Sequence, residues 1–382
     1  MSIGDFLFAS PRGTLRARGV RRAVPPACDG GTLAERAANA LRACPGDQQS
    51  DGPSDRTGIG PGGGDGGGDG DGQGAAIVAG AVPFAADADP CLFVPREIRR
   101  TTTPPPAPRP GRAIVPPDAR YVPTADAYAE MVRRAVARVR AGDLDKVVLA
   151  RSLAVPYAGR TEPLVAAMSA GNPDGYTFAV GLPGGRLLFG VSPELLVSRR
   201  GRAVAARPMA GSAPRDSDPR ELLASAKDRH EHALVVQAVA AALAPYCDEL
   251  SVPECPTPVA AGPLWHLATA VSGRLADPAT TSLTLATSLH PTPAVCGTPT
   301  GEALRLVGEL EPFDRGFYTG LVGWQDPAGD GEWVICLRCA LADGRALTFY
   351  AGAGIVAGSD PAAELAETDV KLSTALGVLV RH

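Results

Sequence analysis

Strand-like segments of this chain occur in clusters, and helical segments interrupt the clusters without a regular alternation of strand and helix. A doubly wound parallel sheet needs a helix after nearly every strand, so this order favours an α+β fold class. The segments between 177 and 206 further predict antiparallel hairpins joined by Pro183-Gly184-Gly185 and Arg200-Gly201 in a meander. Apolar, β-branched runs predict strands at 146–155, 177–180, 187–191, 195–198 and 203–206, and near 267–273, 318–324, 333–341 and 346–356.

Three segments have helical periodicity and recognisable ends. Thr124 can cap a helix with one apolar face that ends at Gly142. Residues 218–221 read Asp-Pro-Arg-Glu, a capping box with proline at the first helical position, which predicts one helix continuing to about residue 243. The last predicted helix starts at Asp360-Pro361 and runs to about residue 379.

Residues 45–74 consist almost entirely of Gly, Asp, Ser and Pro. Such a segment has too few apolar side chains to offset its conformational entropy, so we expect a disordered insertion. A second Pro-rich passage covers 103–117. We therefore expect one domain over 1–382, with the informative sequence in 120–382.

Charge and cysteine content limit the partners and the compartment. The 382 residues are 45% hydrophobic with a net charge of −4, so a large core is expected and nucleic acid is not an expected partner. No apolar run reaches the length that spans a bilayer, and the start lacks the pattern of a secretory signal, so no membrane association and a cytoplasmic location are expected. The eight cysteines are predicted to be reduced; Cys336 and Cys339 should lie on opposite faces of a strand, which argues against zinc.

Two charged residues interrupt apolar patterns. Lys146 begins a strand and shares a face with Val148 and Ala150; burial there would favour a neutral amine that can act as a base. From the pattern alone, a lysine that reaches solvent at the strand end is favoured instead. Glu231 lies on the apolar face of its helix, where it needs a cation; an ion pair and a metal ligand are equally compatible.

Four other positions are less specific by themselves. Glu194 follows Ser192-Pro193 in a bend and by default would face water. Glu367 precedes Lys371 by four residues, the spacing of an ordinary surface pair. Arg338, inside an apolar strand, needs an anionic partner if it is buried. The glycines of 350–355 weaken a strand unless a ligand approaches the backbone there.

A series of motifs in residues 120–382 closely resembles the isochorismate synthases of the chorismate-utilising enzyme family, in particular those of 2,3-dihydroxybenzoate (catecholate siderophore) synthesis. The motifs are DKVVLAR (145–151), SPE (192–194), AGSA (210–213), KDRHEH (227–232), LWHLAT (264–269), HPTP (290–293), ELEPFDR (309–315), GDGEW (329–333), YAGAGIV (350–356) and ELAET with Lys371 (364–371). The resemblance implies a single large α+β domain with two antiparallel sheets packed together and flanking helices.

The resemblance also implies roles for individual residues. Lys146 matches the general base that activates water for attack at C2 of chorismate, and Glu194 matches the general acid that protonates the departing C4 hydroxyl. Glu231 and Glu367 match the carboxylates that bind Mg²⁺, the expected cofactor. The matching substrate-contact positions are Gly211, Ser212, His266, Tyr318, Arg338, Gly352, Ala353, Gly354 and Lys371.

The implied activity is an isomerase reaction, chorismate to isochorismate, by a protein expected to be a monomer. Related anthranilate and aminodeoxychorismate synthases lack the lysine at the position of Lys146. The alternative is a salicylate synthase that goes on to eliminate pyruvate; those enzymes tend to carry threonine where this chain has Ala294. A non-catalytic chorismate-binding protein is disfavoured because Lys146, Glu194 and both metal carboxylates are present. Ala226 and the 45–74 insertion depart from the family pattern without touching these residues.

Overall fold

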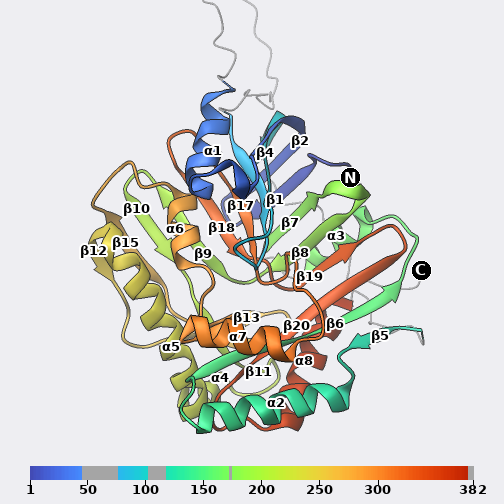
Figure 1. Cartoon of the computed structure of the whole chain (residues 1–382). Coiled ribbons are helices and arrows are strands. Elements are labelled where there is room, and N and C mark those ends of the chain that lie inside the picture. Colours follow the sequence, from blue (N-terminus) through green and yellow to red (C-terminus); the bar gives the residue numbers. More distant parts are fainter. Residues whose placement is uncertain (45–75, 102–117, 172–173, 377–382) are drawn as a thin grey trace, which may run out of the picture.

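The computed structural model describes residues 1–44, 76–101, 118–171 and 174–376. The predictions for 45–74 and 103–117 lie outside these residues. Eight helices and twenty strands occur in the described part of the chain, and every strand pairing there is antiparallel (Figure 1). The α+β prediction is therefore confirmed.

The strands form two sheets joined through β4 (Cys91–Thr101), which pairs with the first strand of each. The first sheet runs in the order β2 (Gly13–Ala23), β1 (Phe6–Ser10), β7 (Tyr176–Gly181), β8 (Leu187–Ser192), β19 (Cys339–Ala342), β20 (Ala346–Ile355) and β6 (Lys146–Pro156), with β5 (Arg120–Val122) and β16 (Gly297–Thr298) on its edge. The second runs β3 (Val78–Val82), β17 (Leu321–Gln325), β18 (Gly331–Ile335), β9 (Leu195–Arg200), β10 (Ala203–Ala206), β15 (Val271–Leu275) and β12 (Cys247–Ser251).

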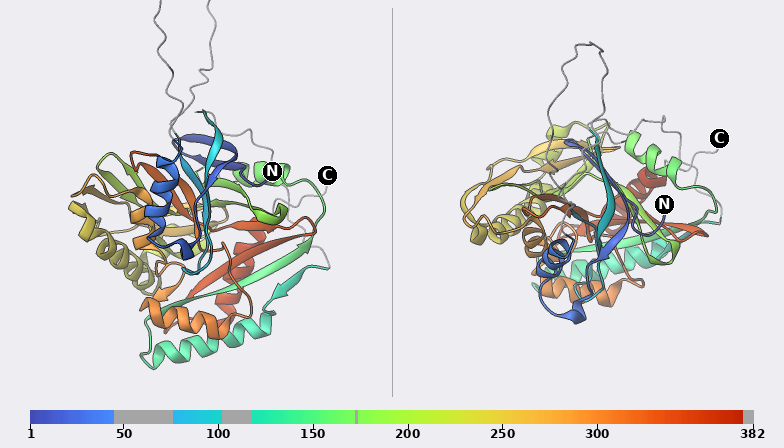
Figure 2. Two further views of the ribbon diagram at one scale, coloured as in Figure 1. Left: turned by 45° about the horizontal axis from the view of Figure 1, so that its top comes forward. Right: turned by 90° about the horizontal axis from the view of Figure 1, so that it is seen from above.

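The two sheets pack face to face, and helices cover their outer faces. Between the sheets lies a core to which both contribute, with Phe6, Phe8 and Phe178 from the first and Val322 and Val334 from the second. Alternation along each strand supplies these inward side chains. The outer face of the second sheet is covered by α1 (Leu33–Arg42), α5 (Ala226–Leu243) and α6 (Ser282–Leu289), and that of the first by α3 (Glu162–Gly171), α8 (Pro361–Leu376), α2 (Ala125–Arg140) and α7 (Thr300–Leu310). Figure 2 shows α2 and α7 side by side below β6 and β20.

A separate sheet of three strands stands beside the end of the first sheet. It consists of β11 (Met209–Pro214), β14 (Leu264–Ala268) and β13 (Thr257–Ala261), and α4 (Pro219–Ala224) packs against it. The α5 helix also contacts β11. This small sheet faces the paired strands β6 and β20 across the functional site described below.

Two predicted elements are interrupted. The helix expected over 218–243 is broken at Ser225, whose extended backbone and side chain cap α5 by accepting from the Asp228 amide. The strand expected over 333–341 stops before Arg338, which adopts a left-handed φ of 46°. Cys336 therefore lies outside any strand, and the prediction of a cysteine pair on opposite strand faces was wrong.

The expected continuous meander is also wrong at one point. The β7–β8 and β9–β10 hairpins are present, but β8 and β9 do not pair with each other. Instead β8 pairs with β19 in the first sheet and β9 pairs with β18 in the second, so the chain changes sheet at Ser192-Pro193-Glu194. Proline has no N–H to donate to a ladder, which favours the end of a strand there. The crossing places Glu194 between the sheets instead of at the surface.

Candidate active site

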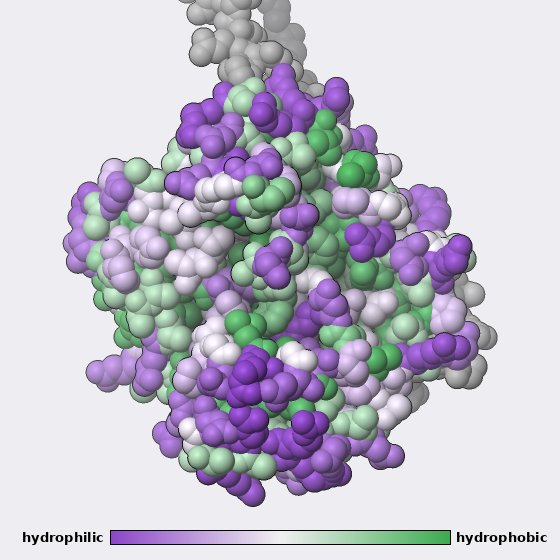
Figure 3. Space-filling view, viewed as in Figure 1, coloured by the Kyte–Doolittle hydropathy of each residue, from purple (hydrophilic) through white to green (hydrophobic). Residues whose placement is uncertain are grey.

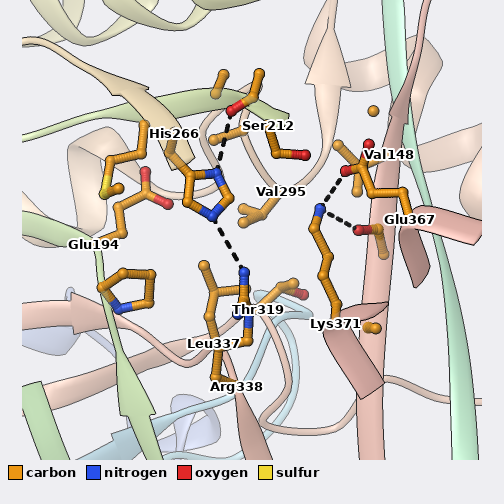
Figure 4. Close-up of a pocket in the computed structure, with 18 of the residues that line it drawn as sticks. Val148, Glu194, Ser212, His266, Val295, Thr319, Leu337, Arg338, Glu367 and Lys371 are labelled. Atoms are coloured by element: carbon orange, nitrogen blue, oxygen red, sulfur yellow. Dashed lines mark hydrogen bonds and ion pairs between the residues drawn. The ribbon is translucent and has the colours of Figure 1, made fainter. Parts of the chain in front are cut away.

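A cavity of about 90 Å³ lies where the paired strands β6 and β20 meet β11, β14, α5 and α8 (Figure 4). Loops at 193–194, 294–295, 318–319 and 337–338 complete its wall. All the predicted site residues line it except Lys146 and Ala353: Glu194, Gly211, Ser212, Glu231, His266, Tyr318, Arg338, Gly352, Gly354, Glu367 and Lys371. Segments from Val148 on β6 to Lys371 on α8 thus form one site.

Lys146 is completely buried at the start of β6. Its ammonium nitrogen lies 2.9 Å from Oε1 of Glu231 and has no aligned hydrogen-bond partner in the described part of the chain. The prediction from the pattern alone, that this lysine reaches solvent at the end of the strand, was wrong. Lys146 does not itself line the cavity, but its partner Glu231 does. A lysine held without hydrogen bonds next to a polar cavity is well placed to interact with a molecule that enters it.

The glycines of β20 make room for this ion pair. A Cβ atom on Gly354 would overlap Oε1 of Glu231 and lie 2.9 Å from Cε of Lys146. Gly352 faces the same way and lies against Tyr318 Oη and Val148. Ala353 points to the opposite face, into the core formed with α2 and α7, so only its backbone borders the site.

Glu194 is 3% exposed, so the prediction that this bend faces water was wrong. Its amide donates to Ser192 Oγ at 3.2 Å, and Arg207 Nη2 donates to the carbonyl of Pro193 at 2.9 Å, which holds the turn in place. Burial raises the pKa of Glu194 to about 8, against the opposing effects of the Met209 amide, Lys146 and Arg207. The carboxyl group is therefore protonated at neutral pH and can donate a proton.

Arg338 and His266 form a chain of hydrogen bonds across the cavity (Figure 4). Burial lowers the pKa of Arg338 to about 10 and that of His266 to about 3, so the imidazole is neutral. His266 Nδ1 lies 3.1 Å from the carbonyl oxygen of Gly211, which can only accept, so Nδ1 carries the hydrogen and Nε2 accepts from Arg338 at 3.2 Å. Gly211 itself has a φ of +73°, a backbone conformation that favours glycine. The guanidinium, which has no ion-pair partner among the described residues, is thereby fixed at the cavity wall.

Glu367 and Lys371 lie on α8 and are half-buried. Lys371 Nζ donates to Glu367 Oε1 at 2.5 Å and to the carbonyl of Gly352 at 2.9 Å. Burial alone would raise the pKa of Glu367, but Lys371, together with His266 and Lys227, more than offsets this, and the pKa lies below its ordinary value. Glu367 is therefore ionised at neutral pH. The pair crosslinks α8 to β20 and is not an ordinary solvated pair.

Sequence reasoning gave no role to several neighbours of the site. Tyr350 lines the cavity and stacks on Tyr318, with ring centroids 5.1 Å apart. Its position two residues before Gly352 on the same strand face could have revealed it. Glu364 is 1% exposed and pairs with Lys227 at 2.8 Å, one turn of α8 from Glu367. The pairing of these two residues is decided by packing between α5 and α8, which no local pattern signals.

Glu231 and Glu367 provide a donor set that suits a hard divalent cation. Both are carboxylates on the wall of one cavity, and each is paired with a lysine here. In the described part of the chain no group of three or more His, Cys, Asp or Glu residues is arranged to hold a metal. Two carboxylates leave most positions of an octahedral ion for water and for substrate oxygens, the arrangement that magnesium often adopts in enzymes. The residues therefore fit Mg²⁺, which stays a prediction.

The comparisons with known proteins agree with this geometry. Residues 99–380 match the family described as "Chorismate binding enzyme". The chain belongs to the chorismate-binding enzymes. It is 43% identical to isochorismate synthase DhbC of Bacillus subtilis, over 98% of this chain and 93% of that one, and 39% identical to isochorismate synthase EntC of Escherichia coli K12, over 80% and 82%.

A solved structure of another chorismate-binding enzyme has the same fold throughout. This is a putative 2,3-dihydroxybenzoate-specific isochorismate synthase, DhbC, from Bacillus anthracis, with a TM-score of 0.85 at 40% identity, covering 98% of this chain and 96% of that one. The family resemblance drawn from the motifs is thus confirmed. The cavity of this chorismate-binding enzyme is its candidate active site.

Proposed function

We propose that this chain is an isochorismate synthase, which converts chorismate to isochorismate. The observation that carries the proposal is a buried glutamic acid that is protonated at neutral pH and lines the cavity of a chorismate-binding enzyme, together with a buried lysine that pairs with another cavity residue, Glu231. The names of relatives with 39–43% identity support the same activity. The reaction needs these two groups because one oxygen must gain a carbon bond while another leaves.

The proton transfers follow from these two groups. Lys146 accepts a proton from water as the water oxygen bonds to C2 of chorismate. The ring double bond shifts, the C4–O bond breaks, and Glu194 gives its proton to the departing hydroxyl, which leaves as water. One water enters and one leaves, so the net change is an isomerisation. Because its pKa is raised, Glu194 is protonated at neutral pH and has a proton to donate.

The remaining residues of the site bind and orient an anionic substrate. Arg338 offers a fixed guanidinium for a carboxylate, and Lys371 offers an ammonium group beside Gly352. Glu231 and Glu367 would hold Mg²⁺, which supplies positive charge to neutralise and orient the ring carboxylate. Gly211, Gly352 and Gly354 line the cavity, so their backbone borders the space that the substrate would occupy.

The test is incubation of the purified protein with chorismate, with and without Mg²⁺, and separation of the products by chromatography. Isochorismate as the sole product, lost on chelation and in Lys146→Ala, is expected. Chorismate left unchanged in the presence of Mg²⁺ would contradict the proposal. A Lys371→Ala variant that keeps the full rate would contradict the assignment of that ammonium group to substrate binding.

The alternative is a salicylate synthase, which eliminates pyruvate after isochorismate forms. Ala294, where such enzymes tend to carry threonine, lines the cavity and so could influence this choice. Salicylate with equimolar pyruvate in the same chromatograms would establish this second activity. Isochorismate without pyruvate would exclude it.

We also propose that the enzyme acts as a cytoplasmic monomer whose product enters 2,3-dihydroxybenzoate synthesis. The cysteines of the described chain are all free, as in a reducing compartment. In the part of the chain that the structure describes, few large hydrophobic residues are exposed, and on the face in Figure 3 hydrophobic and hydrophilic residues are interspersed. None of the helices that the structure describes is long and apolar enough to cross a membrane. Light scattering at working concentration would test the monomer.

A further inference from the structure

A second cavity, of about 180 Å³, adjoins the candidate active site. The two cavities share Pro193 and Arg338 as walls. The outer wall of the second cavity is formed by the end of β13 with the following turn, residues 259–262, and by Arg215, just beyond β11. This cavity therefore connects the active-site wall to the rim of the three-stranded sheet.

Three arginines line this second cavity. Arg215 is exposed, and Arg207 and Arg338 are half-buried, with Arg338 also lining the active-site cavity. Asp174 is the one acidic residue of the lining and is exposed. Within the part of the chain that the structure describes, no carboxylate lies within ion-pair distance of any of the three arginines. The cavity is thus lined by positive charge that the chain itself does not neutralise.

The two outer arginines are held without using up their hydrogen-bonding capacity. Arg215 lies over the Trp265 ring, 3.7 Å from its centroid, which fixes the guanidinium plane through its face. Arg207 Nη2 donates to the carbonyl of Pro193, while its buried Nε has no hydrogen-bond partner among the described residues. Both side chains therefore keep N–H groups available for an anion.

We propose that Arg215 and Arg207 form an anion vestibule, through which the dicarboxylate substrate reaches Arg338 and the product leaves. The inference rests on the proposed function for the identity of the substrate. A cleft of one sign of charge focuses the electric field and raises the local concentration of a counter-ion, which increases the association rate. For a substrate with two negative charges, the favourable electrostatic energy in this field is about twice that of a singly charged ion. Contacts outside the reacting centre change the capture of the substrate and not its chemistry.

The test compares Arg215→Gln, Arg215→Lys and the control Arg134→Gln at several salt concentrations. Arg134 is an exposed arginine of α2, so its substitution changes the net charge equally, away from the cavity. At about 20 mM salt we expect Arg215→Gln to lower kcat/KM by roughly tenfold, with kcat within about twofold of the parent. The difference should shrink at about 300 mM salt, where screening is strong. Arg215→Lys should retain most of the salt dependence because it keeps the charge.

Three results would overturn the vestibule. They are an unchanged kcat/KM in Arg215→Gln, an equal loss in Arg134→Gln, and a loss in Arg215→Lys as large as in Arg215→Gln. The association rate of chorismate, measured by stopped-flow mixing without Mg²⁺, separates this inference from the proposed function. Slower and less salt-dependent association in Arg215→Gln supports the vestibule even if the protein makes no isochorismate. Equal association rates in Arg215→Gln and the parent contradict the vestibule even if the protein does make isochorismate.

Discussion

Glu194 is the residue whose surroundings most alter its chemistry. Because burial raises its pKa to about 8, the proton is present below that pH and lost above it. We expect kcat to be constant near neutrality and to fall about tenfold per pH unit above roughly pH 8. Glu194→Gln, which has the same shape without an acidic proton, should lower kcat by about 10²- to 10⁴-fold. Rate measurements from pH 6 to 10 check both.

The same carboxyl group links stability to pH. Its pKa in the folded protein lies above the ordinary value of 4.5, so its favourable contribution is complete below pH 4.5 and is lost as the pH rises through about 8. Glu194→Gln should therefore show a smaller decline in Tm between pH 7 and pH 9 than the parent. A kcat that stays flat to pH 10, with parallel Tm curves, would contradict the assignment of a buried acid.

At the scale of elements, strand β20 must pass close to the Lys146–Glu231 pair. Gly354→Ala places a Cβ atom against Glu231 Oε1 and Lys146 Cε, so the carboxylate has to move. We expect a loss of activity of 10²-fold or more, because small displacements of reacting groups have large effects on rate. Steady-state kinetics with chorismate measure it.

The matched control is Gly308→Ala on α7, where a Cβ atom meets nothing within 4 Å. Alanine is favoured over glycine inside a helix, so this variant should keep full activity and be more stable by about 0.5–1 kcal/mol. Equal activity in the two variants would show that the space beside Glu231 is not needed.

Strand β6 is fixed by a buried ion pair at its outer edge. Between its pairings with β16 and β5, the Ala150 amide donates to Glu311, and Arg315 donates to the carbonyls of Val148 and Val295. Glu311 and Arg315 are 2.6 Å apart, and both side chains are 2% exposed. They replace a neighbouring strand for the part of β6 that borders the cavity.

Breaking this ion pair should weaken the packing of β6 and of its partner strand β20. Glu311→Gln leaves the Arg315 charge buried without a partner, and we expect the free energy of unfolding to fall by about 3 kcal/mol or more. Urea denaturation measures it. Glu309→Gln, which disrupts an exposed pair with Arg305 on the neighbouring helix turn, should leave the urea midpoint unchanged. Similar midpoints for both variants would mean that the buried pair does not support β6.

At the scale of the whole molecule, the fold should not depend on the proposed metal. Glu231 and Glu367 are already neutralised by Lys146 and Lys371, one from each side of the cavity, and the sheets enclose large apolar cores. A chelator should therefore abolish turnover while changing Tm by only a few degrees. Calorimetry and product assays on one sample test this. Unfolding on chelation would show that the metal is structural.

The sequence by itself determined the fold class, most element positions and the family. The alternating pattern of the strands, the Thr124 cap and the motifs from 145 to 371 each depend on residues that are close in sequence. Such local patterns can be recognised without the three-dimensional structure. The motifs also named the residues that now line one cavity. They could do so because each motif keeps the chemistry of its site together with the turn or strand that presents it.

The tertiary structure alone decided burial, pairing and protonation. Lys146 and Glu194 were expected from their local patterns to face water, and both are buried, Lys146 against Glu231 of α5. The change of sheet at Pro193, the left-handed Arg338 and the contact of Glu364 with Lys227 depend on segments distant in sequence. The pKa of Glu194 follows from that burial, since desolvation is set by everything packed around a group and not by its neighbours along the chain.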